Sequence, residues 1–148
     1  AVARSGYAGC HHDSEAPIDR NNHGLLFLDS QVRFGDIYDG STNTLLIGEA
    51  LTSPDELGWV SGTRATLRNT SVIDEPRPYL ATSPAAASGD AREQRPNSLF
   101  VGGFGSHHPG GLNAAFADGS TRFVSNSIDP DVLRRLGNRA DGEILEPF

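Results

Sequence analysis

Apolar residues lie in short runs along the chain, and residues that favour turns separate these runs. Strands are predicted over residues 25–28, 31–34, 45–48, 57–60 and 65–67. Glycine (17 residues) and proline (9 residues) fill the intervals, and together they exceed the roughly 12% expected from average usage. This pattern is typical of an all-β or β-dominated domain with many turns.

The clearest local pattern lies near the C-terminus. Residues 113–117 and 121–124 are two largely apolar runs that flank Asp118 and Gly119. An Asp-Gly pair supplies the positive-φ positions that a tight hairpin turn requires. We therefore expect these two runs to pair as a two-stranded hairpin.

One short α-helix is predicted after this hairpin. Asp129 is a good N-cap, Pro130 suits the first helical position, and Gly137 is placed to end the helix. The apolar face of the helix consists of Val132, Leu133 and Leu136. A helix of about two turns is unstable alone, so it must dock on the sheet.

The pattern as a whole predicts a single α+β domain over residues 1–148, dominated by an antiparallel sheet. Residues 74–97 stand apart, because they are rich in proline and alanine and hold few large apolar side chains. Loops of this length are uncommon inside compact domains and are usually functional or mobile. We expect a long surface loop here; a variable insertion without a role is the other interpretation.

Charge and composition exclude several classes of protein. The formal net charge is −7, and all 12 basic residues are arginine; an acidic chain is a poor candidate for binding nucleic acid. No apolar run approaches the ~20 residues of a membrane span. The single Cys10 excludes an intrachain disulfide. Methionine is absent, so we expect Ala1 to be a processed N-terminus or the edge of a fragment.

Residues 19–24 partly match the start of a calcium-binding loop. Asp19 and Asn21 lie at alternate positions, where such loops place oxygen ligands, and Asp13 adds a nearby carboxylate. However, His23 occupies a ligand position, and no glutamate stands at the twelfth position. Calcium bound by Asp13, Asp19 and Asn21 is one interpretation, and an Asx-rich turn is the other.

The five histidines form two groups in the sequence: His11, His12 and His23 near the start, and His107 and His108 later. Together with Cys10 they would suit zinc or copper if the two groups met in space. Adjacent side chains in a strand point to opposite faces, so one of each pair at most could serve a single site. A structural or exposed role is the favoured interpretation.

Recognisable catalytic motifs are missing. The sequence has no G-x-S-x-G elbow, and Cys10 beside His11 has no catalytic frame around it. Residues 102–105 resemble a phosphate-binding loop only superficially, because no lysine follows; tight turns or close backbone packing explain these glycines better. Asn69 begins an Asn-Thr-Ser sequon and is a glycosylation candidate.

A more specific pattern links His108 to Asp118 and Gly119, with nine residues between the histidine and the aspartate. This spacing resembles the His-x9-Asp-Gly signature of prepilin-processing-associated proteins, a bacterial family that carries a domain of unknown function. Further segments similar to that family are 5–12, 16–19, 39–44, 47–49, 57–59, 62–70 and 139–143. The resemblance thus runs through nearly the whole chain.

The resemblance implies an exported, pilin-like protein with a β-rich head domain. In that family the head normally follows a hydrophobic N-terminal helix, and we expect this chain to lack that pilin helix. Without it, an extended N-terminal segment could add as a strand to a neighbour's sheet, in a non-closing contact that builds fibres. We expect His108 to fix its loop through a hydrogen bond to the sheet or to a carboxylate.

The sequence therefore predicts a secreted bacterial structural protein rather than an enzyme. The expected function is a subunit of an extracellular filament or a pilus- or pseudopilus-like assembly, with further copies of itself as the partner. The alternative is a monomeric secreted surface module that binds calcium or a glycan. A hydrolase that uses Cys10 or His108 is the least favoured interpretation.

Overall fold

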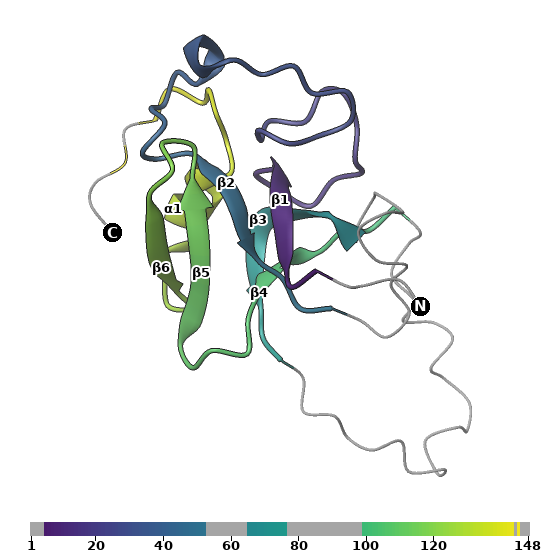
Figure 1. Cartoon of the computed structure of the whole chain (residues 1–148), viewed down its shortest axis with the longest axis vertical. Coiled ribbons are helices and arrows are strands. Elements are labelled where there is room, and N and C mark those ends of the chain that lie inside the picture. The colour runs from purple at the N-terminus through teal and green to yellow at the C-terminus, as the bar shows by residue number, and fades with distance from the viewer. Residues whose placement is uncertain (1–4, 53–64, 77–98, 144, 146–148) are drawn as a thin grey trace.

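The computed structural model describes residues 5–52, 65–76, 99–143 and 145. Within them one six-stranded sheet carries an α-helix, and a short 3-10 helix lies in a loop (Figure 1). The elements are β1 (Tyr7–His12), η1 (Phe34–Asp36), β2 (Leu45–Glu49), β3 (Leu67–Asp74), β4 (Gly103–Gly105), β5 (Gly111–Phe116), β6 (Thr121–Ser125) and α1 (Pro130–Leu136). No helix among these residues is long and apolar enough to cross a membrane.

The strands follow the order β4-β3-β1-β2-β5-β6 across the sheet. The pairs β1–β2, β2–β5 and β5–β6 are antiparallel, whereas β1–β3 and β3–β4 are parallel. The prediction of a β-dominated fold with a mostly antiparallel sheet and one short C-terminal helix is confirmed. The two parallel pairs on the β3 side are the part that the sequence pattern did not indicate.

One face of the sheet forms the core. Leu133 and Leu136 of α1 are buried in it, and full burial of a leucine side chain contributes about 2 kcal/mol. The cluster contains Ala8, Cys10, Leu45, Ala50, Phe104, Leu112, Ala114, Phe116, Val124, Leu133 and Leu136. Because strand side chains alternate, the residues between these point to the opposite side, which we call the outer face.

The predicted hairpin is confirmed as β5–β6, with Asn113 opposite Phe123. Gly119 has a φ of 84°, and among the described non-glycine residues only Asp29 has a positive φ. The turn therefore uses one positive-φ residue instead of the expected two. Backbone bonds from Gly119 N to Phe116 O (3.0 Å) and from Phe116 N to Ser120 O (2.9 Å) close a three-residue loop of the bulged type.

The helix prediction is also confirmed. The Asp129 carboxylate accepts hydrogen bonds from the backbone N of Asp131 (2.8 Å) and of Val132 (3.4 Å). These bonds satisfy two of the free amides at the helix start. The backbone N of Gly137 donates to Arg134 O at the other end, so the helix ends where the sequence indicated.

Two strand predictions are wrong. Residues 25–28 and 31–34 belong to no strand; they lie in the loop between β1 and β2, which also contains η1. The Leu26 side chain covers part of the outer face, where a Cβ on Gly9 would meet it. The prediction at 45–48 is confirmed as β2. The strand at 57–60 and nearly all of the loop at 74–97 lie outside the described residues.

The glycines at 102–105 form the short edge strand β4. A Cβ on Gly103 would lie 2.0 Å from the backbone O of Val72 in β3. Close backbone packing, the interpretation favoured from the sequence, therefore explains why this strand contains glycine.

Candidate functional site

The two histidine groups lie at opposite ends of β1. Tyr7 pairs with Glu49, to which His108 is hydrogen-bonded, whereas His12 ends the strand five residues later. Five residues of extended chain span about 16 Å. The single zinc or copper site that would need both groups is therefore not formed.

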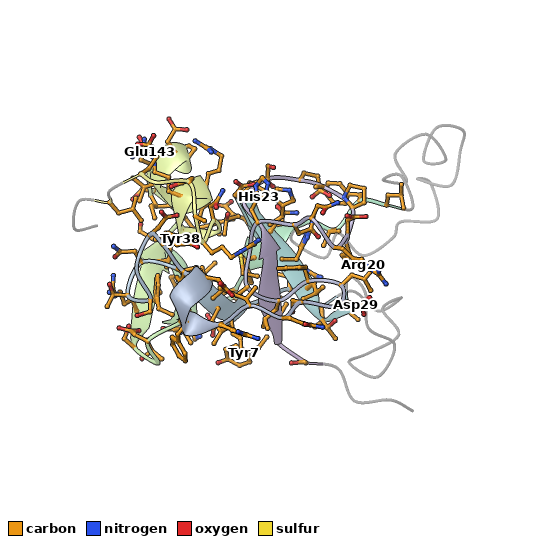
Figure 2. All side chains as sticks on the ribbon, turned by 90° about the horizontal axis from the view of Figure 1, so that it is seen from above. Tyr7, Arg20, His23, Asp29, Tyr38 and Glu143 are labelled. Carbon is orange, nitrogen blue, oxygen red and sulfur yellow. The ribbon has the colours of Figure 1, made fainter. Side chains whose placement is uncertain are left out.

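At the far end of β1, His12, Asp13 and His23 come together. The chain leaves β1 after His12 and returns alongside it, because Gly24 N donates to His11 O at 2.9 Å. This return brings His23 Nδ1 to 3.1 Å from Asp13 Oδ2, and the two histidine rings lie 4.3 Å apart, centroid to centroid. Figure 2 shows His23 beside the end of β1.

Asp13 is the buried centre of this group, and its side chain is 8% exposed. Burial alone would raise its pKa, but hydrogen bonds from His23 and from Asn138 Nδ2 (2.7 Å to Oδ2) outweigh it, so the pKa is lowered. Burial lowers the pKa of His12 despite the neighbouring carboxylate. At neutral pH the group therefore holds an anionic carboxylate beside a neutral His12 imidazole.

Asp19 and Asn21 do not join this group. Asp19 Oδ1 accepts hydrogen bonds from the backbone N (3.0 Å) and the side-chain Nδ2 (3.1 Å) of Asn21. This is the Asx-rich turn that the sequence left open as the second interpretation. The neighbouring pair of Arg20 and Asp29 lies away from His23 in Figure 2. Calcium at Asp13, Asp19 and Asn21 gains no geometric support.

Cys10 and His11 are fully buried in the middle of this region. His11 Nδ1 lies 3.1 Å from Asn22 Oδ1; that oxygen also accepts from the backbone N of Asp19 (2.8 Å), so the ring nitrogen donates. Burial raises the pKa of the Cys10 thiol to about 12. The thiol stays protonated at neutral pH, which removes the nucleophile from the Cys10-hydrolase interpretation.

At the near end of β1, His108 meets a carboxylate, as expected from the sequence. Its Nε2 lies 3.1 Å from Glu49 Oε1, and Glu49 Oε2 accepts from the backbone N of Asn113 at 2.7 Å. His108 precedes β5 and Asp118 follows it, so the two residues of the nine-residue spacing stand at opposite ends of that strand. Asp118 accepts from the N and Oγ of Ser120 in the exposed turn.

Glu15 and Asn69 form a third polar contact, which overturns the glycosylation prediction. Asn69 is 0% exposed in β3, and its Nδ2 donates to Glu15 Oε2 at 2.8 Å. Its Oδ1 accepts from the backbone N of Ser71 at 3.1 Å. A buried amide with both ends bonded is not presented to a glycosylating enzyme by the folded chain.

Sequence patterns missed Glu49, Glu15 and Asn138 as site residues. Glu15 also accepts from the backbone N of Val101 (2.8 Å) and of Gly102 (2.9 Å). Glu49 lies in the 47–49 segment that resembles the family, but the sequence indicated no site role for any of the three. Their partners lie 54 to 125 residues away, so local spacing held no signal for them.

The outer face carries exposed apolar side chains. Tyr7 and Phe123 are each 53% exposed and Ile47 is 37% exposed; strand pairing places all three on this face. Tyr7 and Ile47, but not Phe123, line a shallow groove that Leu26 and Leu67 also line. Figure 2 shows Tyr7 on the side of the sheet opposite α1.

Comparison with known proteins gives one match. The family model described as a protein of unknown function (DUF1559) matches residues 2–131. No curated protein and no solved structure matches the chain. Because the match covers far more than half of its length, the chain belongs to the DUF1559 family of proteins of unknown function.

Proposed function

We propose that the chain is a non-enzymatic structural subunit of an extracellular filament or a pilus- or pseudopilus-like assembly. The observation that carries the proposal is the presence of three exposed apolar side chains on the outer face of the sheet, those of Tyr7, Ile47 and Phe123. Apolar side chains exposed together on one face commonly mark an interaction surface. The resemblance to the prepilin-processing-associated family supports the same function, and we take the partner to be a second copy of this chain.

The sheet offers a route to open-ended contacts. Its edge strands are β4 and β6, and only three residues form β4. A full-length edge such as β6 can accept an extended segment from a neighbour. A contact between two different surfaces of the same subunit builds a fibre when the rotation that relates neighbouring subunits does not close into a ring.

The state of the two candidate catalytic residues supports a non-enzymatic role. The Cys10 thiol is buried and protonated. The His108 imidazole is engaged with Glu49, which in turn holds the β5 backbone through Asn113. The burial of Cys10 and the contact of His108 with Glu49 are thus explained by a role in stabilising the fold.

Sedimentation velocity at increasing protein concentration tests whether the outer face mediates self-association. We expect wild-type chain to associate and Phe123→Glu to weaken that association by about 30-fold or more, because a hot-spot side chain contributes at least about 2 kcal/mol. The matched control is Phe34→Glu, since Phe34 is 77% exposed but lies in η1 rather than on the sheet. Equal loss in both variants, or a wild-type chain that stays monomeric, would contradict the proposal.

A further inference from the structure

Two imidazoles and one carboxylate meet at the end of β1, and the proposed assembly makes no use of them. One ligand atom from each of His12, Asp13 and His23 lies within 4.8 Å of the other two. Among the residues that the structure describes, no other set of three or more His, Cys, Asp or Glu side chains gathers in this way. We call this group the β1-end cluster.

The β1-end cluster supplies the two kinds of donor atom that zinc takes besides thiolate sulfur, which are imidazole nitrogen and carboxylate oxygen. His12 Nδ1 accepts a hydrogen bond from the Asp13 backbone N at 2.8 Å and lies 2.5 Å from Asp13 Oδ1. These contacts hold the His12 ring beside the carboxylate.

A second set of residues fixes the carboxylate. Asn138 Nδ2 donates to Asp13 Oδ2 at 2.7 Å, and Ser14 Oγ donates to Oδ1 at 3.2 Å. Asn138 is itself held, because its Oδ1 accepts from the backbone N of Ala140 at 2.9 Å. Hydrogen bonds behind the ligands are a regular feature of metal sites, where they orient the donor atoms.

The spacing and exposure of the cluster suit a small tetrahedral site. Zinc bonds of about 2.1 Å to nitrogen and oxygen put ligand atoms about 3.4 Å apart in a tetrahedron. The ligand atoms of the cluster now lie up to 4.8 Å apart. Rotation of the His23 side chain, which is 51% exposed, would bring them closer together. That exposure leaves a fourth position open to solvent.

The positive charge of Arg139 opposes the binding of a cation at the β1-end cluster. Arg139 contributes to the lowered pKa of His12 through its charge. Its Nη1, however, donates to the backbone O of Asn22 (2.8 Å) and of Gly24 (2.9 Å). The guanidinium is thus bonded to carbonyl oxygens, and the carboxylate of Asp13 remains as the nearest counter-charge for an ion.

We propose that His12, Asp13 and His23 bind a divalent transition-metal ion of the zinc type, with one coordination position open. Imidazole nitrogen suits zinc, copper and nickel, whereas calcium takes oxygen ligands, so this donor set disfavours calcium. The ion would tie the end of β1 to the segment after α1 through Asn138. This site goes beyond the structural function proposed above and stands independently of it.

Calorimetric titration of the chelator-stripped chain with zinc chloride tests the site. We expect saturable binding with one ion per chain and a rise in melting temperature with zinc concentration, because the ion binds only the folded state. His23→Ala should weaken zinc binding at least 100-fold, since loss of a supporting residue alone costs about 10–100-fold. His23 is half exposed, so this variant should fold, as circular dichroism would verify.

His107→Ala is the matched control, because His107 is an exposed histidine outside the cluster. It should bind zinc as the wild-type chain does. Asp13→Asn, which keeps the shape of the side chain, should weaken binding with the same sign as His23→Ala. The proposal is overturned if the wild-type chain shows no saturable zinc binding, or if His23→Ala binds zinc as tightly as the wild type.

Discussion

Two glutamates act as acceptors for backbone amides at the ends of the sheet. Glu15 accepts from the backbone N of Val101 and Gly102, and Glu49 accepts from that of Asn113. An amide left without a partner in the interior costs about 1–3 kcal/mol. Each carboxylate therefore joins segments far apart in the sequence and stabilises the sheet.

Glu15→Ala should lower the free energy of unfolding by about 2–3 kcal/mol, because it removes three hydrogen bonds to a charged acceptor. Urea denaturation followed by circular dichroism measures this loss. Glu143→Ala serves as the control, since Glu143 makes only an exposed 3.6 Å contact with Arg135 and surface pairs contribute about 0–1 kcal/mol. An equal loss in both variants would refute the role of Glu15.

Glu49 should make the free energy of unfolding depend on pH in the acidic range. Burial raises its pKa, but hydrogen bonds from the Asn113 backbone and from the side chains of Ser106 and Asn113, with the charge of His108, lower it overall. The unfolded chain then takes up the proton first as the pH falls. The stabilisation is complete above the unfolded pKa of about 4.3 and is lost as the pH falls through the folded value.

Urea titrations between about pH 3 and pH 7 measure this dependence. Glu49→Gln should flatten the fall in stability on the acid side, whereas Glu143→Gln should keep the wild-type slope. A wild-type slope in Glu49→Gln would show that the carboxylate does not titrate with folding.

Asp13 shows what sequence spacing could and could not predict about the site. The sequence singles out Asp13 as a candidate calcium ligand, with Asp19 and Asn21 as companions. In the fold its companions are His12, His23 and Asn138. Asn138 lies 125 residues away, and the return of the chain to β1 depends on backbone bonds that no side-chain pattern reveals.

At the scale of elements, the predictions succeeded where local chemistry determines the structure. The β5–β6 hairpin has its Gly119 turn, α1 has its Asp129 cap, and β2 has an apolar run in which Leu45 is buried. Each signal lies within a few residues of the element that it predicts. These three elements were therefore visible in the sequence alone.

Two strands that the apolar pattern largely missed, β1 and β3, contain buried polar residues. β1 contains Gly9, His11 and His12, and β3 contains Asn69 and Thr70, both almost fully buried. Such residues give no apolar alternation, because hydrogen bonds to distant partners satisfy them instead. The strand prediction at residues 25–28 failed for the opposite reason. These residues are apolar although they form no strand, because their loop covers part of the outer face.

Gly103→Ala tests the tight pairing of β4 with β3. The added Cβ would lie 2.0 Å from the backbone O of Val72, which cannot move without opening the parallel pair. We expect a loss of about 2–3 kcal/mol in urea denaturation, at the upper end for overpacking. Gly35→Ala, where a Cβ meets nothing within 4 Å, should change stability by less than about 0.5 kcal/mol. A neutral Gly103→Ala would rule out the close contact.

At the scale of the whole molecule, the two faces of the sheet differ in how far their apolar side chains are covered. α1 and the core cluster cover one face, while part of the outer face exposes Tyr7, Ile47 and Phe123. The β1-end cluster lies at one end of the same sheet. An assembly surface and a metal site can thus act separately, and Phe123→Glu and His23→Ala test them one at a time.

The most direct test of the proposed function is negative-stain electron microscopy of the purified chain at high concentration, with and without calcium. We expect filaments or ordered chains of subunits, and their loss in Phe123→Glu but not in Phe34→Glu. Wild-type chain that stays as single particles under both conditions, with a monomeric sedimentation coefficient, would contradict it.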